Sequence, residues 1–378
     1  MKKIITLFGI VLVLFLSSCS KDSGNTPEAE DTSNTDIPAN PSNITVPEPT
    51  INNIQPTANI TPAANNPGRI QVNLTGLINP ATQNPINLFY NAANPGASNI
   101  FITEDGVVKG LKVTKVSTGN VLNADVVFTV DNSGSMDEEA DSVAASITKF
   151  AAYLQASGLN VRFAVVGYDV YGEVAGGVNF TSAEQIDHYL NKRTSYYGYT
   201  VSGTNRTVGF FGSDSATIEN KANGYASEVS DENGVVAVLF ADANYNWRAG
   251  AQRIFINFTD EPTFTGTNYY WNTAKLISTI GGKATVHTVF SEDTTYYSSY
   301  WDESAERPWE MSKGTGGTIK FIDSYATGLD LTNLPVAGAL SNSYLIEYTA
   351  GSTGKSHTVI ITIIESSADG KREYTISY

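Results

Sequence analysis

Short apolar strands alternate with stretches of helical spacing through the middle of the chain, and this alternation limits the fold more than any other feature. Val126–Val130 predicts a buried strand, and apolar residues then recur at helical spacing up to Gly158. Further buried strands are predicted at Val161–Tyr168, Arg253–Asp260, Thr285–Phe290 and Thr318–Ile322. Repeated β and α elements predict a doubly wound, mostly parallel sheet covered on both faces.

Both ends of this α/β region carry strands of a different kind, with alternating polar and apolar residues. These strands are predicted at Ile70–Leu77, Asn99–Gly106, Val107–Ser117, Ser343–Ala350, Ser356–Ser366 and Lys371–Tyr378. Because the two terminal portions share this character, we expect them to pair into a small flanking β-sandwich. We therefore expect a β domain at 68–120, the α/β domain at 121–340 and C-terminal strands at 341–378.

The N-terminus has the layout of a secretory signal at residues 1–18. Met1–Lys3 is positive, and Ile4–Leu16 is apolar but too short to span a bilayer as a helix. Leu16–Cys19 resembles a bacterial lipoprotein processing site, which implies cleavage before Cys19 and a lipid attached to it. The alternative is a plain signal peptide that happens to contain the only cysteine of the chain.

Residues 19–67 predict a flexible tether between the lipid and the fold. Ser20–Pro67 holds eight of the fourteen prolines and no aromatic residue, so it can bury little apolar area of its own. A polyproline ligand motif is the alternative. We expect a lipid-anchored protein of the cell envelope, at the outer membrane. The faint resemblance of Ser20–Asp22 to the export tags of surface lipoproteins leaves surface exposure open.

The charge of the chain excludes some partners. The formal net charge is -15, and removal of Lys2 and Lys3 with the signal takes it to about -17. A chain this acidic does not attract nucleic acid or anionic lipid by charge. We also expect no enzyme, because the three histidines are far apart and neither HExxH nor GxSxG occurs.

Oxygen-bearing side chains gather at two strand ends of the α/β region. Asp131, Ser133 and Ser135 alternate after one strand, and Asp260 closes another. Ligands of such sheets bind beyond the carboxyl ends of the strands. Hard oxygen atoms without nitrogen or sulfur favour Mg²⁺ over Zn²⁺. The acids at 137–139 fall in the first turn of the next helix, where its dipole favours them; a second adjacent cation site is the alternative.

The pair of motifs DNSGSM after VVFTV and FTDE after RIFIN resembles the von Willebrand factor type A domain and its metal-ion-dependent adhesion site, over roughly Val121–Pro335. The resemblance implies that Ser133 and Ser135 bind Mg²⁺, Mn²⁺ or Ca²⁺ directly, that Asp131 and Asp260 hold it mainly through waters, and that a carboxylate of a protein partner completes the coordination.

The chain departs from the family pattern at one ligand. The family usually supplies a threonine from a loop between the two motifs, and no Gly-Gly-Thr-like stretch stands at the expected distance before Asp260. Counting back from Asp260 indicates Ser230, with Asp231 next to it and Thr207 as a more distant option. An aspartate at this position would leave the metal less electrophilic toward an acidic ligand.

These features predict an envelope lipoprotein whose type A domain binds an acidic group on a protein partner through a divalent metal, in adhesion or ligand binding. The alternative is a scaffold or assembly factor for envelope machinery of the same cell. Tyrosine-rich loops at Arg193–Ser230 and Glu292–Pro308 should lie on the metal face and contribute specificity. Alternatively, their aromatic rings only pack the loops onto the sheet.

Overall fold

The computed structural model describes residues 34–82, 84–115, 123–156, 160–170, 173–194, 200–226, 229, 231–333 and 342–378. The predicted signal peptide, Cys19 and Ser230 lie outside these residues. Within them, no helix is both long enough and apolar enough to cross a membrane.

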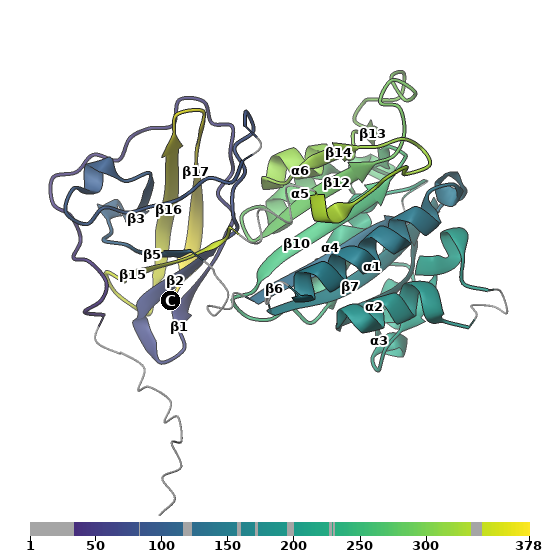
Figure 1. The fold of residues 1–378 in the computed structure, drawn as a ribbon, viewed down its shortest axis with the longest axis horizontal. Helices are drawn as coiled ribbons and strands as arrows, with labels where there is room; N and C mark the ends of the chain where they lie inside the picture. Colours follow the sequence, from purple (N-terminus) through teal and green to yellow (C-terminus); the bar gives the residue numbers. More distant parts are fainter. Residues whose placement is uncertain are drawn as a thin grey trace, which may run out of the picture. The chain divides into compact units, whose positions relative to one another are not determined.

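A seven-stranded, mostly parallel sheet forms the centre of the α/β domain (Figure 1), in the order β14-β12-β10-β6-β7-β8-β9. The strands are β6 (Asn123–Asp131), β7 (Asn160–Asp169), β8 (Glu173–Thr181), β9 (Gly209–Phe211), β10 (Gln252–Thr259), β12 (Ala284–Phe290) and β14 (Ile319–Phe321). The predicted mostly parallel sheet is confirmed. Two strands depart from it: β8 runs antiparallel to β7, and β9 runs parallel to β8. The connection between β7 and β8 is short, and a short connection can join only antiparallel strands.

Helices cover both faces of this sheet. They are α1 (Ala140–Ala156), α2 (Ala183–Asp187), α3 (Ser215–Ala222), α4 (Gly234–Asn244), α5 (Thr273–Ile280) and α6 (Glu310–Thr315). Successive residues of β6 point to opposite faces: Val126 and Phe128 pack with α1 and α2, whereas Val127 packs with α3, α4 and α5. This two-sided burial explains why apolar residues follow one another at Val126–Phe128 instead of alternating with polar ones.

Short elements complete the α/β domain and the loops. They are the 3₁₀ turns η1 (Pro95–Ala97), η2 (Gly134–Asp137), η5 (Gly203–Thr207), η6 (Thr267–Tyr269) and η7 (Leu331–Asn333), the π-helical turn η4 (His188–Lys192), and the paired strands β11 (Thr263–Phe264) and β13 (Ala305–Glu306).

Two antiparallel sheets flank this domain in sequence, in the orders β1-β2-β15-β5 and β17-β16-β3-β4. Their strands are β1 (Ala58–Ala63), β2 (Asn66–Leu74), β3 (Ile100–Glu104), β4 (Val107–Val108), β5 (Lys112–Lys115), β15 (Tyr344–Thr349), β16 (Ser356–Glu365) and β17 (Ala368–Ser377). C-terminal β15 pairs with β2 and β5, and β16 pairs with β3. The two terminal portions therefore pair, as their shared alternation predicted, and one apolar core joins both sheets.

The flexible tether predicted through Pro67 does not extend that far. Ala58–Ala63 forms strand β1, and Ile37 and Ile54 are buried. Arg69 pairs with Asp36, and the Asp369 carboxylate accepts hydrogen bonds from the backbone N–H groups of residues 50–52. A composition argument counts only the apolar area within a segment, whereas residues 34–67 are held by partners supplied by distant strands.

Candidate metal centre

Asp131 ends strand β6 with its carboxylate fixed by two hydrogen bonds. The backbone N–H of Ser133 donates to Oδ1 at 3.0 Å, and the Thr259 hydroxyl donates to Oδ2 at 2.7 Å. The side chain is only 2% exposed. The strand, the turn after it and the neighbouring strand β10 therefore set its orientation together.

The two serines connect Asp131 to the second motif. The hydroxyls of Ser133 and Ser135 lie 2.9 Å apart, and Ser135 donates to Oδ1 of Asp260 at 3.0 Å. Asp260 directly follows β10, which pairs in parallel with β6 in a register that sets Phe258 against Val130. This register brings together four side chains that the sequence placed at strand ends more than a hundred residues apart.

The loop that was expected to supply a further ligand lies only in part within the described residues. Ser230 lies outside the described residues. Thr207 is buried, and its hydroxyl donates to Oδ1 of Asn132 at 2.9 Å, one residue after Asp131. A Cβ atom on Gly167 would lie 2.3 Å from the Thr207 carbonyl oxygen, so the close approach of this loop to β7 requires glycine there. Thr207 thus anchors a neighbouring loop to the turn after β6.

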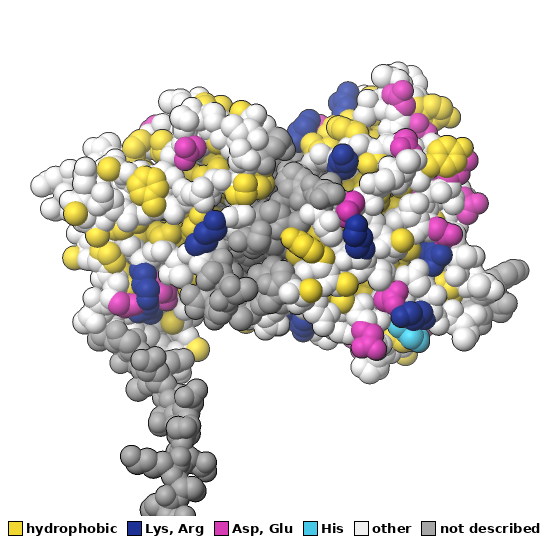
Figure 2. All heavy atoms as spheres, viewed as in Figure 1, with side chains coloured by type: hydrophobic (Ala, Val, Ile, Leu, Met, Phe, Trp, Pro, Cys, Tyr) yellow, Lys and Arg dark blue, Asp and Glu magenta, His cyan; other side chains and the backbone are white. Residues whose placement is uncertain are grey.

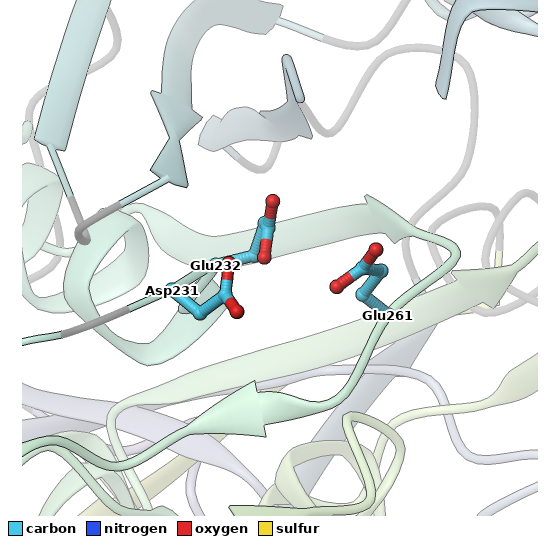
Figure 3. Close-up of side chains that lie close together, drawn as sticks. All are labelled: Asp231, Glu232 and Glu261. Atoms are coloured by element: carbon cyan, nitrogen blue, oxygen red, sulfur yellow. The ribbon is translucent and has the colours of Figure 1, made fainter. Parts of the chain in front are cut away.

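A group of three carboxylates lies at a place where the sequence indicated only Asp231. One carboxylate oxygen from each of Asp231, Glu232 and Glu261 lies within 4.8 Å of the other two. Figure 3 shows Asp231 and Glu232 on the segment before α4, with Glu261 across from them. We missed Glu232 and Glu261 in the sequence, although Glu261 stands in the FTDE motif and Glu232 just before a helix. Neither position by itself shows that the two loops meet.

Glu139 is the third of the acids expected at the start of α1, and it differs from the other two. Asp137 and Glu138 are exposed, as acids on a helix N-terminus usually are. Glu139 is 1% exposed, its Oε1 accepts a hydrogen bond from the Ser291 hydroxyl, and its Oε2 is buried without a hydrogen-bond partner. The helix dipole therefore does not account for Glu139 on its own.

Burial disfavours the ionised form of these carboxylates. It raises the pKa of Asp131 to about 8, with the Asp260 charge adding to the effect, and the pKa of Asp260 to about 6. Burial likewise raises the pKa of Glu139 to about 7 and that of Glu232. Among the described residues, no Lys, Arg or His pairs with any of them.

The donor set fits a hard divalent cation. It consists of hydroxyl and carboxylate oxygens, and the buried anions have no positive partner within the described chain. Ionised carboxylates buried without a counter-charge are costly, so a bound cation would remove much of that cost. The same argument does not favour Zn²⁺, because no nitrogen or sulfur ligand stands in the set.

Some aromatic residues of the two tyrosine-rich loops pack onto the sheet, whereas others are exposed and free for recognition. Phe210 and Phe211 pack onto opposite faces of the sheet, so they serve the core. In the loop at 292–308, Tyr296 is 69% exposed, whereas Tyr297 packs on Trp301 with ring centroids 5.8 Å apart. The Tyr297 side chain interacts with Glu261, and burial and then the Glu261 charge raise the pKa of Tyr297. Figure 2 shows apolar and acidic side chains interspersed on the α/β domain.

A surface cavity of about 1350 Å³ continues from this loop. Its walls include Trp301, Trp309 and Phe321, together with Arg307 and Lys320. Trp309 contacts both Trp301 and Phe321, with ring centroids 5.4 and 5.1 Å apart. The rings of this wall therefore support one another, and only part of their surface is free for a ligand.

Comparison with known proteins gives little help. No family model matches the chain, and no curated protein matches it. Among solved structures, it is similar to the pilus adhesin SpaC from Lactobacillus rhamnosus GG in its open conformation, at 13% identity and a TM-score of 0.33. The match covers 85% of this chain and 55% of the adhesin chain, so this chain spans about half the length of that one. A similarity at this level supports no conclusion on function.

Proposed function

We propose that the α/β domain is a von Willebrand factor type A domain that binds an acidic group on a protein partner through a divalent metal. One observation carries the proposal: the Ser133, Ser135 and Asp260 side chains form a hydrogen-bonded chain at the carboxyl ends of the paired strands β6 and β10. These are the residues that the two sequence motifs single out.

The proposed metal is Mg²⁺, with Mn²⁺ or Ca²⁺ as substitutes. Ser133 and Ser135 would hold it with their hydroxyls, and Asp131 and Asp260 through water. Hydroxyl ligands are neutral, so a metal held in this way keeps positive charge with which to attract a carboxylate. Thr259 and the Ser133 N–H keep the Asp131 carboxylate in place before any ion binds, so its side chain loses little conformational entropy on binding.

The proposed setting is the cell envelope, with a lipid on Cys19 as the membrane anchor. The lipobox-like Leu16–Cys19 supports this part of the proposal. Mass spectrometry of the protein purified from membranes tests it, because lipidation adds a diacylglyceryl mass to a chain that begins at Cys19. Loss of membrane association in a Cys19→Ser variant is the expected result.

The metal site is tested by isothermal titration calorimetry of Mg²⁺ and Mn²⁺ into the metal-stripped mature chain. Ser133→Ala and Asp131→Ala should each lower the number of bound ions by one, whereas Ser278→Ala, which changes an exposed serine on α5, should leave that number unchanged. A number of bound ions that neither site substitution lowers would rule out the proposed centre.

The acidic partner is tested separately. Binding of a library of carboxylate-bearing peptides to the immobilised protein should appear with Mg²⁺, vanish in EDTA and vanish in Ser133→Ala. Metal binding without any metal-dependent peptide capture would contradict the ligand-binding role. Pull-downs from the envelope of the same cell and from foreign surfaces then distinguish a scaffold from an adhesin.

A further inference from the structure

We infer that Asp231, Glu232 and Glu261 form a second cation site, next to the proposed site at Asp131, Ser133, Ser135 and Asp260, because Glu261 directly follows Asp260 and interacts with the Ser135 hydroxyl. The inference goes beyond the proposed function and does not require it. It begins from the distances among the three carboxylates: one oxygen of each lies within 4.8 Å of one oxygen of the other two, although they come from two separate loops (Figure 3).

The two loops are fixed to each other by bonds that do not involve the carboxylates. The backbone N–H of Phe264 donates to the Glu232 carbonyl at 3.0 Å, and the Asn233 side-chain amide donates to the Phe264 carbonyl at 2.6 Å. Asn233 also caps α4, because its Oδ1 accepts a hydrogen bond from the Val236 N–H at 3.0 Å. The three acids are therefore held close together by the fold itself, against their mutual repulsion.

Glu232 gives independent evidence of a missing positive partner. The side chain is 3% exposed, and its Oε2 atom is buried without a hydrogen bond. A buried carboxylate oxygen without a partner is costly, and native structures rarely retain one without a reason. Burial and the neighbouring acids raise its pKa. A cation bound by both oxygens of the Glu232 carboxylate would satisfy this atom.

The charge count supports two cations rather than one. Asp131, Glu139, Asp260 and the three acids of the cluster carry six formal negative charges when ionised, and none of them forms an ion pair within the described chain. One divalent ion leaves four of these charges uncompensated, whereas two leave two. That remainder is small enough for hydrogen-bond donors and solvent to stabilise.

The donors also differ in kind between the two places. The first set includes two serine hydroxyls, whereas the cluster offers carboxylates alone. Carboxylates can bind through one or both oxygens, which suits the six to eight oxygen ligands and the adaptable geometry of Ca²⁺ better than the strict octahedron of Mg²⁺. Asp231 and Glu261 are only partly buried, so water can reach the site and complete the coordination. We therefore assign Ca²⁺ as the ion.

The test counts the ions bound by the full mature chain. Metal-stripped protein is dialysed against Ca²⁺, and bound calcium is measured by mass spectrometry of the element. The wild type should bind two ions. Glu232→Gln and Ser133→Ala should each bind one, and the double variant should bind none. Glu219→Gln, which neutralises an exposed acid on α3, should still bind two. Near-ultraviolet circular dichroism checks that each variant is folded, and Asp231→Asn replaces Glu232→Gln if that variant is not.

The counts separate this inference from the proposed function. One ion that survives Ser133→Ala and is lost in Glu232→Gln would support the second site while refuting the first. One ion that is lost in both variants would show a single shared site and overturn the inference. A wild type that binds no calcium, or a Glu232→Gln variant that keeps the wild-type count, would overturn it as well.

Discussion

Replacing Asp131 by asparagine should stabilise the metal-free protein at neutral pH while removing its stabilisation by Mg²⁺. Burial raises the pKa of this 2% exposed carboxyl from 3.8 to about 8. Asparagine is similar in shape and uncharged. Its amide can still accept from the Ser133 N–H and bond the Thr259 hydroxyl, so the variant keeps the local geometry and loses only the buried charge.

The sign and size of this effect follow from the pKa shift. Because the folded-state pKa lies above the ordinary value, the folded protein binds more protons than the unfolded chain between pH 3.8 and about 8. The free energy of unfolding therefore falls as pH rises through this window. At 1.36 kcal/mol per unit, the wild type loses at most about 2 kcal/mol at pH 5 and about 4 kcal/mol at pH 7. Asparagine avoids this loss.

Urea unfolding in EDTA at pH 5 and pH 7 measures the difference. Asp131→Asn should exceed the wild type in free energy of unfolding at both values, and by more at pH 7. Added Mg²⁺ should then stabilise the wild type and leave the variant unchanged. A variant that is less stable than the wild type at pH 7 in EDTA would refute the reasoning, because the carboxylate would then have a stabilising partner.

Asp125, at the other end of the same strand, provides the matched control. It is fully buried like Asp131, but Arg162 and Arg248 pair with it at 2.8 and 2.7 Å. Asp125→Asn breaks these pairs and leaves guanidinium groups without their partner. This variant should therefore lose about 3 kcal/mol of stability, in the opposite direction to Asp131→Asn.

Three further predictions concern stability. Lys109→Met leaves the buried Glu104, which Lys109 contacts at 2.6 Å, without its cation, and urea unfolding should show a loss of about 3 to 5 kcal/mol. Asp369 has a lowered pKa because hydrogen bonds from residues 50–52 outweigh its burial. Its contribution to the free energy of unfolding is therefore present above pH 3.8 and is lost as pH falls through the folded pKa. Asp369→Ala should lack this pH dependence and expose residues 50–52 to limited proteolysis at neutral pH. Tyr168→Phe removes a hydroxyl that donates to a backbone carbonyl of β10 at 3.2 Å, and should cost about 1 kcal/mol by the same unfolding assay.

Strand positions and the first motif were predictable because their signals are local. An apolar run such as Val126–Val130 identifies a strand buried on both faces, whatever its neighbours are. Residues that follow such runs lie at the carboxyl edge of a parallel sheet, so Asp131 and Asp260 could be placed near one another before the fold was known. The pairing of the terminal strands was predictable for the same reason, from alternation that each strand shows on its own.

The contacts between distant loops could not be predicted in this way. Nothing near Glu232 in the sequence shows that it is buried, or that Glu261 lies opposite it, because both facts depend on how the segment before α4 meets the segment after β10. The antiparallel direction of β8 and the folded structure of residues 34–67 could not be predicted for the same reason. Local pattern depends on the side chains of one segment, whereas burial and proximity arise from all the segments that pack around it.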